Sequence, residues 1–354
     1  MSTTTLSRVR IVGSGLIGTS IALGLVQRGV SVQIVDSDPA NQALANDLVG
    51  GVEVENPELV IFGLPSSHLH LVIQEEIALN PHSTFMDVGS VKTEVVLQVE
   101  TISALSTRFV PTHPMAGREI GGAGSARADL FQGRSWILTP SADLQQRSKE
   151  LVLELIALLG ATPIELTAQD HDQAVAKISH LPQIAASLLA KQLSGTPAAW
   201  MELAGQGLRD TTRIAGSDEA LWKEIIFSNR AELEGLLINL HNDLQSMIQS
   251  LDDPEKIAQL LAAGRAGKAA IPGKHGGVAR EYSYLPIVID DKPGQLGAIF
   301  NECAAMNVNV EDLIIEHSPG QLSALITLAL SLVDAEKLSA HLTSIGWNVH
   351  PIRK

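Results

Sequence analysis

Short apolar runs alternate with longer stretches of helical period along the first half of the chain. Six runs rich in β-branched residues fit strands, at 8–12, 31–35, 59–63, 84–88, 109–112 and 135–139. Between them, apolar residues recur with the 3.6-residue period of a helix. This order predicts a mainly parallel sheet with helices on both faces, an α/β domain spanning residues 7–167.

The pattern changes twice further along the chain. From 168 to 263 the period is helical throughout, which predicts an all-helical domain. Residues 264–281 are basic and rich in Gly, a composition typical of a linker. In 282–354 the pattern indicates a strand, a helix, two strands about a turn at 318–320, a helix and a strand. We therefore expect a small βαββαβ, ferredoxin-like domain there.

The turn after the first expected strand contains Gly13, Gly15 and Gly18. In a strand–turn–helix unit the first glycine permits the tight turn, the second lets backbone N–H groups approach a pyrophosphate, and the third allows close helix packing. Asp36 ends the next strand, where an acid can bind the adenosine ribose. A merely tight turn is the alternative, but this context favours a Rossmann-type dinucleotide site. Its expected residues are Gly13, Ser14, Gly15, Leu16, Ile17, Gly18 and Asp36.

Asp36 also bears on the choice of dinucleotide. Its carboxylate would repel a 2′-phosphate, which favours NAD over NADP. Ser37 and Asp38 follow directly and leave the local geometry open, so NADP stays an alternative.

The composition narrows the class of protein. The chain has 354 residues, of which 45% are hydrophobic and 18% charged, as in ordinary globular proteins. Its formal net charge of -14 repels phosphate backbones, so nucleic acid is not an expected partner. The single cysteine, Cys303, excludes an internal disulfide framework, and neither an apolar leader nor an 18-residue apolar run occurs. These features predict a cytoplasmic protein without a membrane span.

His113 follows the strand expected at 109–112, within the segment Thr112-His113-Pro114-Met115-Ala116-Gly117. Ligand crevices in such folds lie beyond the carboxyl ends of the strands. An imidazole with an ordinary pKa near 6.5 can accept the proton that an alcohol loses when it gives up hydride. The alternative is a histidine that caps a turn. No spacing of His and Cys indicates a metal site.

Three further clusters accompany His113, at 87–92, 179–183 and 209–215. Together with the glycine turn they resemble the prephenate dehydrogenase family, also called prephenate/arogenate dehydrogenases, and residues 282–354 resemble an ACT regulatory domain. The resemblance covers nearly the whole chain. It implies NAD-dependent oxidative decarboxylation of prephenate to 4-hydroxyphenylpyruvate in tyrosine biosynthesis, with no metal. The domain order favours a homodimer through the helical segment.

The resemblance also implies roles for individual residues. His113 matches the family's catalytic histidine, and Ser90 matches a serine that hydrogen-bonds near it. For Ser90 the alternative is a helix N-cap, worth about 1 kcal/mol of stability. Arg213 matches the arginine that binds the substrate carboxylate, and Asp210 is expected to pair with it, although an ordinary surface pair is the alternative.

Other residues near these motifs receive different expectations. The expected substrate contacts, besides Arg213 and Asp210, are His180, Gln183 and Glu119. Lys92 either assists the charge of the cofactor or substrate or is an ordinary exposed lysine in the first turn of a helix, and it is left unassigned. We expect His171 to cap the first helix of the helical domain and not to touch the substrate.

The last domain suggests regulation. Gly294 opens its first helix, where a bare glycine lets an amino-acid carboxylate approach the helix N-terminus. The resemblance implies an amino-acid effector, with tyrosine as the first candidate and Asn309 as a second contact. The alternative is a domain that only dimerises. The basic residues of the linker, Lys274 and His275 among them, are either a solvated spacer or a segment that folds over the active site.

Three other functions stay open on the sequence. An arogenate dehydrogenase would accept the aminated side chain and give tyrosine directly. A nucleotide or amino-acid sensor without activity would have no need of His113, Ser90 and Arg213 together. A 3-hydroxy acid dehydrogenase would need a catalytic lysine in the helical domain, where Lys177 and Lys191 occur in no motif that we recognise.

Overall fold

The computed structural model describes residues 6–102, 105–118, 120–271, 282–317 and 322–353. By its internal contacts the chain divides into two compact units, Met1–Asn242 and Asp243–Lys354. Each unit is described below by itself.

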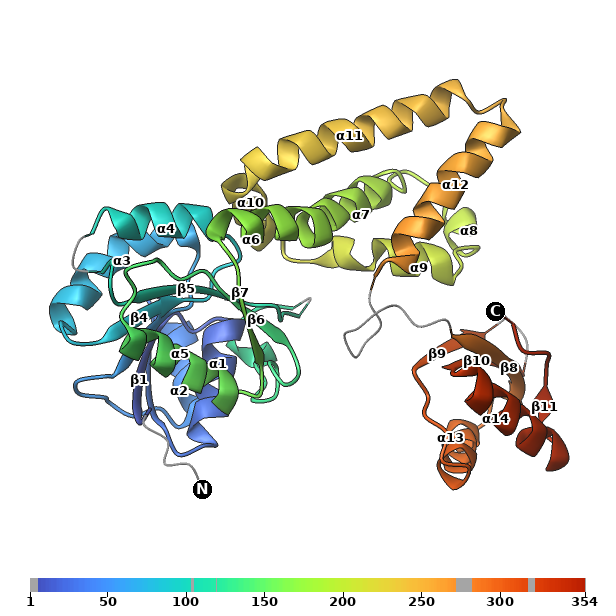
Figure 1. Cartoon of the computed structure of the whole chain (residues 1–354), viewed down its shortest axis with the longest axis horizontal. Coiled ribbons are helices and arrows are strands. Elements are labelled where there is room, and N and C mark those ends of the chain that lie inside the picture. The colour runs from blue at the N-terminus through green and yellow to red at the C-terminus, as the bar shows by residue number, and fades with distance from the viewer. Residues whose placement is uncertain (1–5, 103–104, 119, 272–281, 318–321, 354) are drawn as a thin grey trace. The chain divides into compact units, whose positions relative to one another are not determined.

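The first unit contains a seven-stranded sheet with the order β2-β1-β3-β4-β5-β6-β7 (Figure 1). Its strands are β1 (Arg8–Val12), β2 (Ser31–Val35), β3 (Leu59–Phe62), β4 (Thr84–Asp87), β5 (Phe109–Pro114), β6 (Ser135–Leu138) and β7 (Thr162–Glu165). Every neighbouring pair is parallel except β5 with β6. The predicted mainly parallel sheet is confirmed. The prediction did not include β7, whose four residues are all exposed and so carry no buried apolar pattern.

Helices cover both faces of this sheet because successive strand residues point to opposite sides. The helices are α1 (Leu16–Val26), α2 (Pro39–Val49), α3 (Ser66–Leu79), α4 (Thr93–Glu100) and α5 (Gln146–Leu158), with a short 3-10 turn η1 (Ala123–Ser125). Leu59 and Ile61 of β3 belong to one core with α1 and α5. Val60 and Phe62 belong to a second core with α3 and α4. There the Phe62 ring stacks against those of Phe85 and Phe109, with centroids 6.2 Å apart in each pair.

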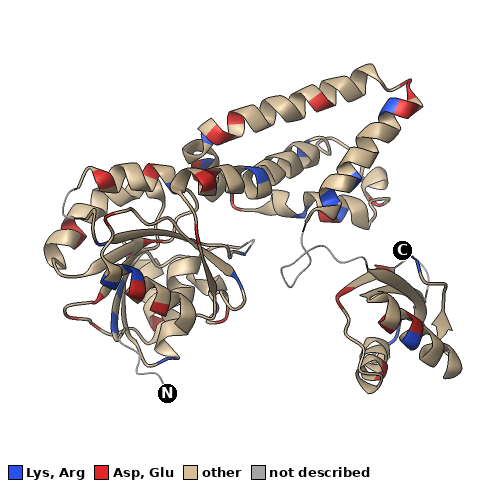
Figure 2. Ribbon diagram, in the orientation of Figure 1, with Lys and Arg blue, Asp and Glu red and all other residues tan. Residues whose placement is uncertain are grey.

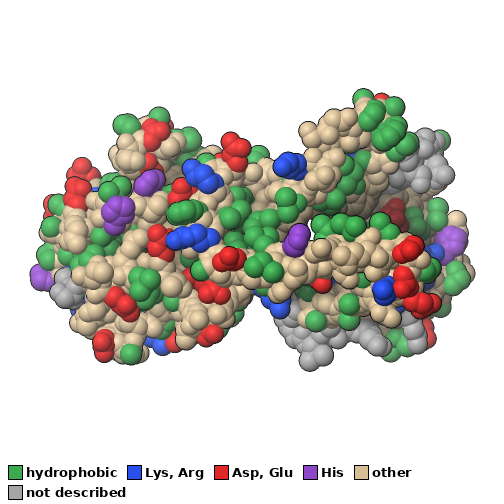
Figure 3. Space-filling model, turned by 90° about the horizontal axis from the view of Figure 1, so that it is seen from above, with side chains coloured by type: hydrophobic (Ala, Val, Ile, Leu, Met, Phe, Trp, Pro, Cys, Tyr) green, Lys and Arg blue, Asp and Glu red, His purple; other side chains and the backbone are tan. Residues whose placement is uncertain are grey.

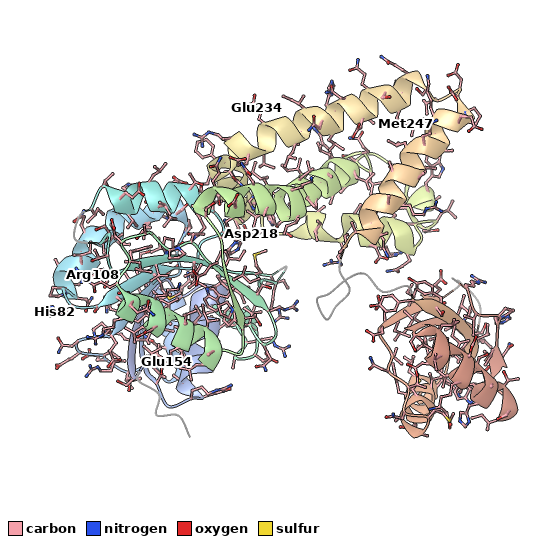
Figure 4. All side chains as sticks on the ribbon, viewed as in Figure 1. His82, Arg108, Glu154, Asp218, Glu234 and Met247 are labelled. Atoms are coloured by element: carbon pink, nitrogen blue, oxygen red, sulfur yellow. The ribbon has the colours of Figure 1, made fainter. Side chains whose placement is uncertain are left out.

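Helical elements follow the sheet, and no strand occurs among the described residues from 168 to 263, as predicted. They are α6 (Ala168–Val175), a π-helix η2 (Ala176–His180), α7 (Leu181–Lys191), α8 (Ala198–Met201), α9 (Gln206–Thr212), a 3-10 turn η3 (Arg213–Gly216), α10 (Glu219–Ser228) and α11 (Arg230–Gln249). Side-chain caps fix where two of them begin. The Thr167 hydroxyl accepts from the Asp170 N–H at 3.0 Å, and the Asp218 carboxylate, labelled in Figure 4, accepts from the Leu221 N–H at 2.9 Å.

The second unit contains a small antiparallel sheet with the order β11-β8-β10-β9. Its elements are α12 (Pro254–Ala269), β8 (Ser283–Asp290), α13 (Gln295–Ala305), β9 (Asp312–His317), β10 (Ser323–Leu330), α14 (Leu332–Ser344) and β11 (Asn348–Val349). Every second residue of β8 and β10 points into one apolar core that α13 and α14 also line. Ile287 of β8, Ile326 of β10 and Leu338 of α14 are examples. The predicted βαββαβ order is confirmed, although the last strand has two residues where we expected 347–352.

The expected linker begins too early, because α12 extends into it. This helix runs to Ala269, so residues 264–269 are helical and not irregular. Ala, Arg and Lys are good helix formers, and the two glycines in this stretch cost only about 1 kcal/mol each in a helix. Residues 272–281, with Lys274 and His275, lie outside the described residues.

The surface carries charges of both signs. Figure 2 shows acidic and basic residues distributed over the helices and loops, and on the face seen in Figure 3 the basic side chains are scattered among acidic and apolar ones. No helix in the described part of the chain has both the length and the apolar character needed to cross a bilayer.

Candidate active site

The glycine turn has the geometry that the sequence analysis expected. Gly13 has φ 109°, and a Cβ there would collide with the carbonyl oxygen of Gly63, next to the end of β3. A Cβ on Gly18 would collide with the Gly13 carbonyl oxygen. Around Gly15, in contrast, nothing lies within 4 Å of where a Cβ would stand. Two glycines therefore close the turn against the sheet, and the third leaves open space at the N-terminus of α1.

Asp36 lies beside this turn. Its Oδ2 accepts hydrogen bonds from both the backbone N–H and the hydroxyl of Ser14, each at 2.7 Å, and its Oδ1 accepts from the Asp38 N–H at 2.9 Å. Burial opposes ionisation, but these hydrogen bonds lower the pKa of Asp36 below its usual value. No side chain caps α1, so its first N–H groups face the open space at Gly15. A helix N-terminus of this kind suits a pyrophosphate, and the residues present fit a bound dinucleotide.

The Lys92 side chain links the ends of β4 and β5. Its partners are Asp87 at the end of β4 and Thr112, the residue before His113, on β5. The side chain is fully buried, and its Nζ donates to Asp87 Oδ2 and, at 2.7 Å, to the carbonyl oxygen of Thr112. Burial lowers the pKa of Lys92, although Asp87 and Asp172 oppose this shift. Of the two alternatives for Lys92, the exposed lysine is excluded, because the buried Asp87 carboxylate takes the ammonium group as its partner.

His113 contacts a second histidine that we had assigned to another role. Its Nδ1 lies 2.8 Å from Nε2 of His171, and the two rings meet edge to face at 75°. Nδ1 of His171 lies 2.7 Å from Oδ1 of Asp172. His171 is fully buried, and Thr167, not His171, caps α6. The expectation that His171 caps this helix is therefore wrong.

Asp172 also determines where α4 begins. Its Oδ1 accepts from the Lys92 N–H at 2.8 Å, and its Oδ2 accepts from the Thr93 N–H at 2.7 Å. Burial opposes ionisation, but hydrogen bonds from His171, Thr93 and Lys92 lower the pKa of Asp172. The N-cap that we considered as an alternative for Ser90 is thus supplied by Asp172. Ser90 is partly exposed on the loop between β4 and α4.

The charges around His113 favour a neutral imidazole. Burial lowers the pKa of His113 well below its ordinary value, and His171, Lys92 and His180 act in the same direction. Asp172 opposes this shift. At neutral pH the ring is therefore unprotonated on one nitrogen, as a general base must be.

His180 belongs to the same cluster through an asparagine. Nδ2 of Asn229 donates to the Asp172 carbonyl oxygen at 2.9 Å and lies 3.1 Å from Nδ1 of His180. The His180 ring also meets Trp222 edge to face, with centroids 6.0 Å apart. Burial lowers the pKa of His180 to about 4. His180 ends the π-helix η2, a kind of irregularity that often occurs at functional sites.

Gln183 contacts the backbone of the turn that contains Arg213. Gln183 is buried, and its Nε2 donates to the Ile214 carbonyl oxygen at 2.9 Å, so it anchors the turn η3 that Arg213 opens. Arg213 is exposed. Asp210 is exposed on α9, which ends before Arg213, and accepts from Gln206 Nε2 at 2.8 Å. Glu119 lies outside the described residues.

The sequence analysis missed several members of this site. They are His171, Asp172, Lys92, Asp87 and Asn229. The run Asp170-His171-Asp172 was a usable signal, since acids on both sides of a histidine at a helix start offer it a hydrogen-bond partner. Asn229 carries no local signal, because its partners are 49 and 57 residues away.

In the second unit, the two expected effector contacts have distinct settings. Gly294 has φ 91° and precedes α13, which has no side-chain cap, and nothing lies within 4 Å of where its Cβ would stand. Asn309 is exposed, and its Nδ2 donates to Glu311 Oε1 at 2.8 Å.

Comparison with known proteins identifies the family. Residues 15–165 match the nucleotide-binding domain of prephenate dehydrogenase, and residues 167–262 match its dimerization domain. A Streptomyces niveus protein named "Probable prephenate dehydrogenase NovF" is 29% identical over 354 residues, which cover 95% of this chain and 98% of that protein.

Two solved structures are similar to this chain. A prephenate dehydrogenase from A. aeolicus, in complex with hydroxyphenyl propionate and NAD+, is 25% identical with a TM-score of 0.68, covering 77% of this chain and 100% of its own. The arogenate dehydrogenase of Synechocystis is 26% identical with a TM-score of 0.61, covering 74% of this chain and 98% of its own. The two family matches together span most of the chain, and it belongs to the prephenate dehydrogenase family.

Proposed function

We propose that this protein is an NAD-dependent prephenate dehydrogenase, which oxidises and decarboxylates prephenate to 4-hydroxyphenylpyruvate. The observation that carries the proposal is the position of His113, which lies at the carboxyl end of β5 in the same sheet as the glycine turn and contacts His171. The name of the Streptomyces relative and the ligands of the A. aeolicus structure support it.

His113 acts as the general base in the proposed reaction. When bound, NAD supplies the acceptor for the hydride that leaves the ring carbon bearing the 4-hydroxyl. As this carbon becomes a carbonyl, the O–H bond breaks and its proton moves to His113. Loss of carbon dioxide then sends the electron pair of the broken C–C bond into the ring, which becomes aromatic, and the resulting phenolate takes the proton back. The chain needs to position the hydroxyl, the nicotinamide and one base, with no covalent intermediate.

The proposed substrate is an anion, whereas the chain has a formal net charge of -14. A local cation must therefore hold the substrate carboxylate. We assign this role to the exposed Arg213, whose paired N–H donors fit two carboxylate oxygens at once. Gln183 supports it indirectly by anchoring η3. His180, Asp210, Glu119 and Ser90 stay proposed contacts of the same site.

The second candidate is an arogenate dehydrogenase, favoured by the similarity to the Synechocystis enzyme. The two substrates differ in whether the side chain ends in a keto or an amino group, away from the reacting hydroxyl. His113 would perform the same chemistry on both.

An amino-acid effector and a homodimer complete the proposal. The open space at Gly294, before a helix without a side-chain cap, suits an amino-acid carboxylate, and tyrosine is the first candidate. Asn309 is the proposed second contact. The match to a dimerization domain supports a homodimer through the helical segment. With one cysteine and an acidic composition, we expect the protein to work in the cytoplasm.

A direct assay tests this proposal. Purified protein is mixed with prephenate or arogenate and with NAD or NADP, and reduced cofactor is followed by absorbance, with and without tyrosine. We expect the highest kcat/KM for prephenate with NAD. A higher kcat/KM for arogenate would select the second candidate, and no turnover with either substrate would contradict both.

A further inference from the structure

The geometry points to a further role for two residues: His171 and Asp172 are positioning residues that set the tautomer of His113 and share the proton it takes from the substrate. This inference rests on the proposed function of His113 as the base. It concerns three side chains in a row, His113 on β5 and His171 and Asp172 on α6. His113 lies 2.8 Å from His171, and His171 lies 2.7 Å from Asp172.

The direction of each hydrogen bond follows from Asp172. Both of its oxygens accept backbone N–H groups, so the carboxylate is held in place and acts as an acceptor only. Nδ1 of His171 must then carry the hydrogen that lies toward Asp172. This leaves a lone pair on Nε2 of His171, which accepts the Nδ1 hydrogen of His113. The chain of contacts thus assigns the tautomer of His113 with a bare Nε2, the nitrogen available to a substrate hydroxyl.

The same chain gives the accepted proton a second place to reside. When Nε2 of His113 takes the substrate proton, the Nδ1 hydrogen of His113 can pass to Nε2 of His171. His113 is then neutral again, and His171 is an imidazolium whose Nδ1 hydrogen faces Asp172. Return of both hydrogens to their first positions supplies the proton that the phenolate product needs, so no proton is gained or lost.

The charges that face the two rings favour this placement. Lys92 is buried nearby and disfavours positive charge on His113, although its ammonium group is paired with Asp87. His180 is held neutral with its Nδ1 toward Asn229. Asp172 favours positive charge in this cluster, and it contacts His171 directly. The positive charge of the reaction is thus stabilised best on the ring farther from the substrate.

Two substitutions at His171 separate positioning from proton sharing. In His171→Gln the amide oxygen can accept the Nδ1 hydrogen of His113, so the tautomer is kept, but an amide cannot hold the proton. We expect kcat to fall about tenfold, less than the 10² to 10⁴ that a whole general base typically contributes, because His113 itself stays in place. In His171→Phe a ring of similar volume is kept, but it has no acceptor for the Nδ1 hydrogen of His113, so the tautomer of His113 is no longer fixed. We expect kcat to fall by about 10² or more. Both variants should bind NAD as the wild type does, because the side-chain contacts of His171 are with His113 and Asp172 and not with the glycine turn.

Two kinetic readouts distinguish this role from simple packing. In mixtures of H₂O and D₂O, the wild-type rate should depend on two exchangeable protons and that of His171→Gln on one. The acid limb of the kcat/KM profile should move to lower pH in His171→Gln, because the proton must then stay on His113, where burial disfavours it. Equal kcat, pH profiles and isotope dependence in the wild type and both variants would overturn the inference.

A measurement on the free protein keeps this test independent of the substrate. Imidazole ¹⁵N NMR of the wild type should show His113 and His171 each protonated at Nδ1 and bare at Nε2 at neutral pH. In His171→Phe the His113 signal should become a mixture of tautomers. If the wild type turns over neither substrate, the proposed function fails, and these spectra alone decide the inference. An Nε2-protonated His113 in the wild type would contradict it.

Discussion

The glycine turn and the His113 cluster lie in the same sheet but are built in opposite ways. Gly13, Gly15 and Gly18 lie within six residues of chain, and their requirements concern backbone atoms and open space. His113 depends on Asp87, Lys92, His171 and Asp172, which come from β4, the segment before α4, and α6. The turn therefore needs residues without side chains, whereas the cluster needs several buried polar side chains that satisfy one another.

This difference predicts where each region is vulnerable. A substitution in the turn acts through steric collision with backbone that cannot move far. A substitution in the cluster acts through a buried polar group that loses its partner. The following variants test this contrast, from the largest expected effect to the smallest.

Lys92→Met should give the largest loss of stability. It leaves the Asp87 carboxylate buried without its ammonium partner, and breaking a buried pair costs about 3–5 kcal/mol. The free energy of unfolding from denaturant titration measures the effect. The double variant Asp87→Asn/Lys92→Met removes the orphaned charge and should recover part of the loss; a single variant as stable as the wild type would contradict the account.

Gly18→Ala and Gly15→Ala form a matched pair in the turn. At Gly18 the added methyl collides with the Gly13 carbonyl oxygen, so we expect a loss of about 1–3 kcal/mol in unfolding free energy. At Gly15 the methyl meets open space in the protein, so stability should stay near that of the wild type while the Kd for NAD rises. Thermal unfolding and NAD titration of both variants check this. Equal stability losses would contradict the open space at Gly15, and an unchanged Kd for NAD in Gly15→Ala would refute its assignment to the dinucleotide.

Arg213→Ala should act on substrate binding. The guanidinium meets the same carboxylate in the ground and transition states, so its removal raises KM about tenfold or more and leaves kcat little changed. Steady-state kinetics with prephenate measure both constants, with Arg209→Ala on the preceding helix α9 as the control. A normal KM with a poor kcat would show that Arg213 has another role.

His180 should affect stability only below neutral pH, so its effect under ordinary assay conditions is the smallest of these. Its pKa is about 4 in the folded protein and near 6.5 in the unfolded chain, so in this window the unfolded state binds more protons. Its contribution is therefore present above pH 6.5 and is lost as the pH falls toward 4. His180→Gln should flatten this part of the curve of unfolding midpoint against pH. An unchanged slope would mean that His180 titrates normally.

The contrast between the regions also explains what the sequence could predict. The turn and the βαββαβ order depend on neighbours in sequence, so periodicity and glycine spacing were sufficient. The sequence pointed to His113 because it lies at the end of a strand, but it did not indicate which residues contact His113. The role of His171 depends on Asp172 and on the approach of β5. A lysine is rarely fully buried unless it is paired, so the sequence alone favoured an exposed side chain for Lys92. Pairing across 80 residues, as between Lys92 and Asp172, leaves no local pattern.

The central claim is that His113 accepts the substrate proton, and His113→Asn tests it most directly. NADH formation is followed in a single turnover with prephenate, beside a titration of NAD in the absence of substrate. We predict a rate lower by about 10² or more with an unchanged Kd for NAD, as loss of a general base requires. A variant that forms NADH at the wild-type rate would contradict the account.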